Sequence, residues 1–233
     1  MLRSLSAEEP AKEPLVSALM LHHFADLLRI RHELGQARSL AEEAVAIFRR
    51  HPVWPSEEQH ALQVLASILA EQGDSAALAA FYPDALAASS KLLNQQDTAA
   101  VSSLRRLAAV FFHAGFLREA QTLYRQAAEC YRVCAEADDI DALNGLAWLL
   151  ATCPDATVRD GRRAVALAQR AVELTKWQSS NALDTLAAAY AEVGEFASGV
   201  RAEKQAMALL PEAARESFAV RLRIYEASRP FHD

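Results

Sequence analysis

The clearest indication of the fold is the stretch from Leu183 to Phe196, which reads LDTLAAAYAEVGEF. Its two leucines, one alanine and the tyrosine recur at i, i+3, i+4 and i+7, and residues at this spacing share one face of a helix. Gly194 then predicts a helix stop, because glycine readily adopts the left-handed conformation that ends many helices. A second apolar stripe begins at Phe196, so the stretch predicts a hairpin of two helices.

The same pattern occurs five times along the 233-residue chain. A leucine in the first helix of each copy marks the period, with spacings of 38, 42, 39 and 40 residues: Leu27, Leu65, Leu107, Leu146 and Leu186. Composition supports helices, because 49 residues are Ala, the strongest helix former, against 7 Gly and 8 Pro. One hairpin cannot bury its own apolar stripe, so neighbours must stack. The sequence therefore predicts an all-α protein, an α-solenoid of about five helix-turn-helix hairpins.

The repeats resemble the tetratricopeptide repeat (TPR) family, most closely over residues 101–213. The stretch 183–196 quoted above carries the resemblance together with Ala206 and Pro211, and Leu104 to Ala127 matches equally well. Residues 143–211 are similar to a stretch common in bacterial proteins. The period exceeds the family's usual length of about 34 residues, which implies longer helices or loops. A related class of degenerate helical repeat stays open for the first half of the chain.

This resemblance implies one superhelical domain over residues 15–233, preceded by a mobile tail at 1–14. The expected units lie near residues 17–50, 57–93, 99–134, 139–176 and 180–211. A capping helix is expected at 212–228, because the sequence from Pro211 to Ala227 has the pattern of one amphipathic helix. Small residues let paired helices approach closely, and Gly199 takes this place in the last unit. Pro83 predicts a kink or a break in the second helix of the second unit, because proline cannot donate a backbone hydrogen bond.

Composition argues against several kinds of partner. The net charge is −6, and neither half of the chain is basic, with 8 Lys and Arg against 13 Asp and Glu in residues 1–100 and 16 against 17 in the remainder. Nucleic-acid binders usually carry a basic face, so we expect no nucleic acid. No apolar run approaches the roughly 20 residues of a membrane span, so we expect a cytoplasmic protein that contacts no membrane.

No motif indicates catalysis or a cofactor. The chain has no Gly-rich phosphate loop and no GxSxG elbow. His22 and His32 lie ten residues apart, too far for one metal ion without a third element, and Cys130 and Cys134 are expected to be small core residues. We therefore expect no catalytic residue, no metal and no cofactor, although side chains distant along the chain can still converge.

In the resembling family the first helix of each hairpin lines a concave groove that holds a peptide. That implication selects residues on the non-packing face of these helices, most of them polar or aromatic: His22, Arg29, Gln63, Ser67, Arg105, Ala109, His113, Asn144, Trp148 and Asp184. Trp148 follows the packing residue Ala147 and is expected to anchor a partner side chain. The alternative is that Trp148 only fills space against the next first helix, around Asp184 to Ala188.

The leading hypothesis is a non-enzymatic scaffold that binds a peptide or helix of a partner protein in this groove. The alternative is a structural helical-repeat module that self-associates and has no dedicated ligand. A hydrolase built from scattered His, Asp and Glu side chains is a weaker third hypothesis. The sequence leaves open whether residues 1–14 fill the groove.

Overall fold

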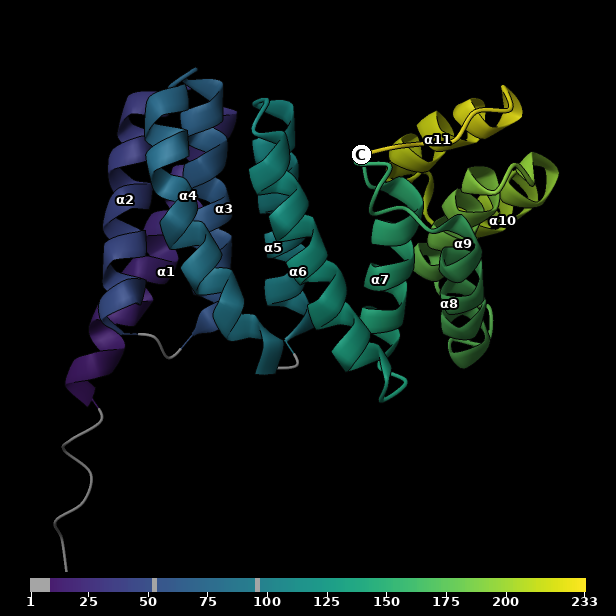
Figure 1. Ribbon diagram of the computed structural model, residues 1–233, viewed down its shortest axis with the longest axis horizontal. Helices are drawn as coiled ribbons and strands as arrows, with labels where there is room; N and C mark the ends of the chain where they lie inside the picture. The colour runs from purple at the N-terminus through teal and green to yellow at the C-terminus, as the bar shows by residue number, and fades with distance from the viewer. Residues whose placement is uncertain (1–8, 52–53, 95–96) are drawn as a thin grey trace, which may run out of the picture. The chain divides into compact units, whose positions relative to one another are not determined.

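The computed structural model describes residues 9–51, 54–94 and 97–233. Over these ranges it contains eleven α-helices and two short 3-10 helices, and no strand. Consecutive helices form hairpins, as Figure 1 shows. The expected all-α, helical-repeat fold class is therefore confirmed.

Ten of the helices form five consecutive pairs. In chain order these are α1 (Glu9–Ile30) with α2 (Leu34–Arg50), α3 (Pro55–Glu71) with α4 (Ser75–Ser90), α5 (Thr98–His113) with α6 (Leu117–Ala135), α7 (Ile140–Thr152) with α8 (Gly161–Leu174), and α9 (Ser180–Glu192) with α10 (Phe196–Ala208). The short helix η1 (Lys91–Asn94) follows α4, and η2 (Glu212–Ala214) precedes the last helix, α11 (Glu216–Glu226).

The chain divides into two compact units, Met1–Leu123 and Tyr124–Asp233. In the first unit, α3 packs against α1, α2, α4 and α5. In the second unit, α9 packs against α7, α8 and α10, and α11 packs against α10. First helices of neighbouring pairs therefore contact each other within each unit, and the single domain over residues 15–233 stays a prediction.

Small residues at the helix contacts permit close packing. Ala37, Ala41 and Ala44 on α2 are completely buried, as are the alanines along the inner face of α8. At Gly199 on α10, an added Cβ would lie 3.0 Å from the carbonyl oxygen of Ala187 on α9. This backbone approach gives the reason for glycine in the last hairpin.

Turn and cap residues fix the ends of the helices. The glycine after α3, α5 and α9 has a positive φ, of 69°, 89° and 82° at Gly73, Gly115 and Gly194. Side chains accept a hydrogen bond from a backbone N–H in the first turn of α4, α5, α7, α8 and α9, with these N-cap residues: Asp74, Asp97, Asp139, Asp160 and Ser179. These caps satisfy donors that the helices leave unpaired.

The first hairpin departs from its sequence pattern. His32 takes the left-handed position between α1 and α2, with φ of 60°, and Gly35 lies inside α2 rather than at the turn. Leu28 is the buried leucine of α1, at 5% exposure, whereas Leu27 is 59% exposed and Phe24 54%. The buried stripe of α1 therefore runs one residue later than the period indicates, because the leucine pair offers two overlapping registers.

The structure differs from the sequence-based expectation in three further segments. Helix α1 begins at Glu9, so Glu9–Pro14 is helical, while residues 1–8 lie outside the described residues. Helix α4 continues through Pro83, whose exposed position leaves water to bond the freed carbonyl. The expected capping helix is two elements, because the 3-10 turn of η2 ends at Arg215, which donates to the Leu210 carbonyl at 2.9 Å.

Candidate partner-binding surfaces

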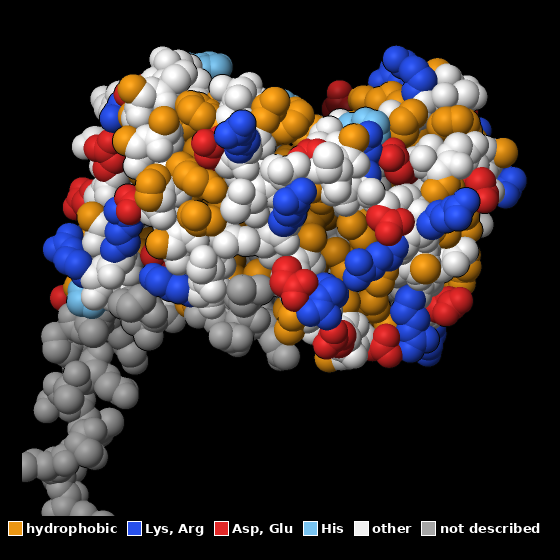
Figure 2. Space-filling view, in the orientation of Figure 1, with side chains coloured by type: hydrophobic (Ala, Val, Ile, Leu, Met, Phe, Trp, Pro, Cys, Tyr) orange, Lys and Arg blue, Asp and Glu red, His pale blue; other side chains and the backbone are white. Residues whose placement is uncertain are grey.

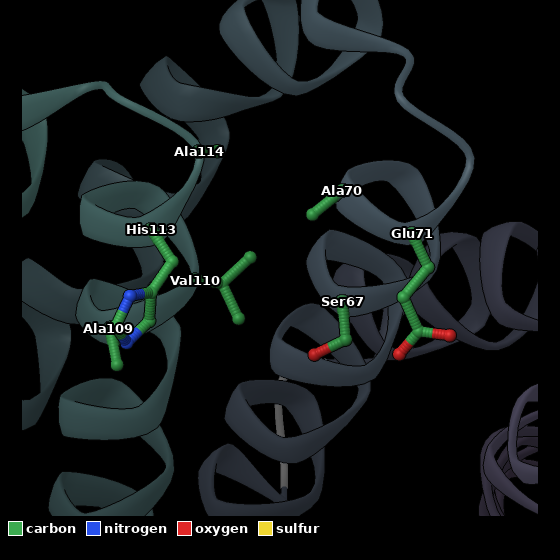
Figure 3. Close-up of a pocket in the computed structure, with 7 residues that line it drawn as sticks. All are labelled: Ser67, Ala70, Glu71, Ala109, Val110, His113 and Ala114. Carbon is green, nitrogen blue, oxygen red and sulfur yellow. The ribbon is translucent and has the colours of Figure 1, made fainter. Parts of the chain in front are cut away.

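A hollow lies between α3 and α5 in the first unit. It has a volume of about 390 Å³ and is lined by seven residues, Ser67, Ala70, Glu71, Ala109, Val110, His113 and Ala114. Figure 3 shows Ser67 and Ala70 on α3 facing Val110 on α5, with Glu71 and His113 at opposite margins. We call this site the α3–α5 hollow. Its floor is apolar and its margins carry an acidic and an imidazole side chain.

Hydrogen bonds hold the α3 wall of the hollow in place. The Gln63 amide donates to the Ser67 hydroxyl at 3.1 Å, and that hydroxyl donates to the Gln63 carbonyl at 3.0 Å. The Arg29 guanidinium of α1 donates to Glu71 at 2.5 Å and to Asp26 at 2.8 Å. Because Arg29 neutralises Glu71 from the α1 side, this margin is an ion pair and not an isolated negative charge.

Three residues predicted in the first unit line this hollow, namely Ser67, Ala109 and His113. Gln63 and Arg29 are not lining residues, but Gln63 bonds Ser67 and Arg29 pairs with Glu71. His22 is completely buried. Arg105 is half-buried on α5 and is not among the lining residues. Ala70 and Val110 line the hollow but were not among the predicted residues, because a small apolar residue on its floor has the same sequence pattern as a core residue.

In the second unit, a segment of the same chain covers the predicted anchor Trp148. The Trp148 indole N–H donates to the Asp233 carboxylate at 2.9 Å, and its ring centroid lies 6.0 Å from that of Phe231. The Asp233 backbone N–H donates to the Thr152 carbonyl at 2.8 Å. His232 approaches Glu192 on α9 at 2.8 Å. These contacts place residues 229–233 across α7 and α9, and we call these residues the 229–233 segment.

Arg221 on α11 contacts both this segment and the helices α7 and α9. Its guanidinium lies 5.6 Å from the Trp148 ring centroid, 5.9 Å from that of Phe231 and 4.9 Å from that of Phe218. Arg221 also donates to Asp184 at 2.6 Å. Cation–π contacts of a half-buried guanidinium add to the ion pair, so Arg221 fixes both the segment and α11.

Asp184, predicted as a groove residue, is instead 7% exposed and belongs to this buried ion pair. Glu203 on α10 lies 3.8 Å from Arg221 and is completely buried. Burial, followed by the Asp184 charge, raises the pKa of Glu203 to about 9, so Glu203 is protonated near neutral pH. Protonation leaves one negative charge, on Asp184, facing one positive charge on Arg221.

Asn144 is half-buried on α7, one turn before Trp148, and its Oδ1 has no hydrogen-bond partner among the described residues. Sequence reasoning selected Asn144 and Trp148 but missed Arg221, Phe231 and Asp233, which contact or cover Trp148. Arg221 lies on the expected capping helix, and no sequence pattern considered above indicated that residues 229–233 cover Trp148.

Three further features of the described residues concern the cysteines, the helix lengths and the surface charge. Cys130, Cys134 and Cys153 are buried free thiols, and no described helix is long and apolar enough to cross a membrane. On the face drawn in Figure 2, basic and acidic side chains lie among one another and form no patch of one sign.

Comparison with solved structures identifies similar folds. The thermophilic TPR protein TTC0263 of Thermus thermophilus is 15% identical, with 90% of this chain and 99% of that chain covered and a TM-score of 0.56. BtubC (BKLC) from P. vanneervenii is 18% identical over 88% of this chain and 91% of its own, with a TM-score of 0.50. No family model and no curated protein matches the sequence. At these identities the likeness concerns architecture alone, and the chain has the TPR-like helical-repeat fold.

Proposed function

We propose that this protein is a non-enzymatic scaffold that binds a polypeptide segment of a partner protein on the exposed face of its first helices. The TPR-like fold supports an interaction or scaffold role in general terms. The α3–α5 hollow is the site that we assign to the partner, because its apolar floor and polar margins suit a side chain with its flanking backbone.

The observation that carries this proposal is the 229–233 segment on α7 and α9. There the first-helix face already holds a stretch of polypeptide through an indole N–H, a backbone carbonyl and a carboxylate: Trp148, Thr152 and Glu192. The same repeat architecture therefore has the chemistry to hold extended chain. Since the Trp148 face is occupied in cis, a partner segment has the α3–α5 hollow available.

The test uses two substitutions of the same kind. Ala109→Arg places a long cation in the hollow, and Ala80→Arg places the same side chain on the exposed face of α4. Each chain, with wild type beside it, is used for affinity purification from the native source, followed by quantitative mass spectrometry. We expect a partner retained by wild type and Ala80→Arg but reduced at least tenfold by Ala109→Arg. Equal yields from all three chains, or no partner for wild type, contradict the proposal.

A second function, self-association, is supported by an unusual stripe on α1. Five large apolar side chains are between 47% and 68% exposed along one side of this helix: Val16, Met20, Phe24, Leu27 and Ile30. An exposed apolar stripe of this length marks interaction surfaces more often than isolated apolar residues do. Light scattering over a hundredfold concentration range tests it, with Phe24→Glu as the disrupting variant and Val220→Glu as the control. A wild-type mass that stays monomeric throughout contradicts self-association.

A further inference from the structure

Three imidazoles gather between α1 and α3. His22 and His23 come from α1 and His60 from α3, and their ring centroids lie 4.1, 5.0 and 5.6 Å apart. One ligand nitrogen from each of the three lies within 4.8 Å of the others. Glu57, one turn before His60, places its Oε2 3.4 Å from His22 Nε2. The cluster therefore presents three nitrogen donors and one carboxylate.

The hydrogen bonding of His22 determines which of its nitrogens is a donor. Nδ1 lies 3.1 Å from the Ala18 carbonyl oxygen, and a carbonyl only accepts, so Nδ1 carries the hydrogen. In a neutral ring, Nε2 then presents its lone pair. This nitrogen is buried, has no hydrogen-bond partner among the described residues, and faces the Glu57 carboxylate. Two lone pairs that face each other at this distance are unfavourable unless a proton or a metal cation lies between them.

The surroundings keep these imidazoles available as ligands. Burial lowers the pKa of His22 to about 4, and burial together with the Arg106 charge lowers the pKa of His60. The direction of both shifts favours the neutral form of the ring, which is the form that binds a metal. A backbone carbonyl on the remote ring nitrogen, as at His22, is also the outer-shell contact that orients most metal-bound histidines.

We propose that His22, His23, His60 and Glu57 bind one divalent cation of the zinc class and thereby join α1 to α3. Imidazole nitrogens with one carboxylate suit zinc far better than magnesium or calcium, which prefer oxygen ligands. Tetrahedral coordination at Zn–N distances of about 2.1 Å requires ligand atoms about 3.4 Å apart. His23 is exposed and His60 half-exposed, so their rings can rotate to close the remaining gap.

The test is zinc binding to the full chain after removal of metal by a chelator. Isothermal titration with zinc chloride should show one site per chain, and the midpoint of thermal unfolding should rise with the zinc concentration, because a ligand that binds only the folded state stabilises it. Cobalt should give the intense visible absorption of a tetrahedral site. The absence of zinc binding in the folded wild-type chain overturns the proposal.

The variants separate this site from adventitious binding by histidine. His23→Ala and His60→Ala alter exposed or half-exposed side chains, so circular dichroism should show the wild-type helix content. Each should weaken zinc binding at least about a hundredfold and abolish the thermal shift, and Glu57→Gln should weaken it about tenfold. His113→Ala is the matched control on α5 and should bind zinc like wild type. If His60→Ala and His113→Ala bind zinc with the same affinity, whether both match wild type or both are weakened, the assignment is overturned.

Discussion

Substitution of Gly145 on α7 by alanine tests how closely α6 and α7 pack. A Cβ at this position would lie 2.5 Å from Tyr131 Cε1 and 2.6 Å from Cζ. Tyr131 is 3% exposed, so its ring has core neighbours on its other sides. Carbon atoms pack at about 3.5 Å or more, and the ring must therefore retreat by about 1 Å.

Two opposing effects set the size of the change. Alanine within a helix is favoured over glycine by about 1 kcal/mol. Overpacking of a close-packed core by one added group costs about 1–3 kcal/mol. We expect Gly145→Ala to lower the free energy of unfolding by about 1 kcal/mol. Gly35 in α2 is the matched control, because its added Cβ would meet no atom within 4 Å, and Gly35→Ala should gain up to about 1 kcal/mol.

Urea unfolding followed by circular dichroism at 222 nm measures both variants against wild type. A double-mutant cycle with Tyr131→Leu locates the cause, because the shorter side chain removes the ring that collides with the new methyl group. In a chain that already carries Tyr131→Leu, the further change Gly145→Ala should be neutral or stabilising. If Gly145→Ala stabilises the wild-type chain as much as Gly35→Ala does, the packing argument is refuted.

Three further outcomes follow from buried and capping groups. The free energy of unfolding should fall as pH rises from about 4.5 to about 9, because folded Glu203 keeps its proton up to about pH 9 while the unfolded chain loses it near 4.5. The slope contributed by Glu203 is at most about 1.4 kcal/mol per pH unit. Urea titrations at several pH values should show a flatter profile for Glu203→Gln than for wild type. Burial raises the thiol pKa of Cys130 to about 11 and that of Cys153 to about 12. A disulfide reagent at pH 8 should therefore modify these two thiols only after denaturation. Rapid labelling of either thiol in the folded chain would contradict this prediction. Asp139→Ala removes the cap of α7 and should cost about 1 kcal/mol in urea unfolding, whereas unchanged stability would show that the cap is replaceable.

Much of the fold could be predicted because its signals are local. Helix faces, stops at Gly73, Gly115 and Gly194, and the close approach at Gly199 all follow from residue types within one hairpin. Where two registers fit equally well, as at Leu27 and Leu28, the pattern alone selected the wrong one. Packing against α2 and α3 resolves this choice, because it determines which leucine is covered.

The candidate sites depend on contacts between residues far apart in the chain. Gln63 and His113 were selected because they follow the face of their own helices; His113 lines the α3–α5 hollow, whereas Gln63 contacts the lining residue Ser67. Trp148 was found by the same reasoning, but no pattern within α7 indicates that Asp233 accepts its indole hydrogen bond 85 residues later.

Local sequence patterns encode the helices, their pairing into hairpins and the TPR-like repeat, because a period of 3.6 residues and a small-residue contact are properties of short segments. What the exposed helix faces contact depends instead on the tertiary fold. It placed His60 beside His22 and His23, and the 229–233 segment over Trp148, because such contacts depend on the three-dimensional course of the chain. The spacing of His22 and His32 argued against one metal ion shared by these two side chains, and it carries no information about a ligand on α3.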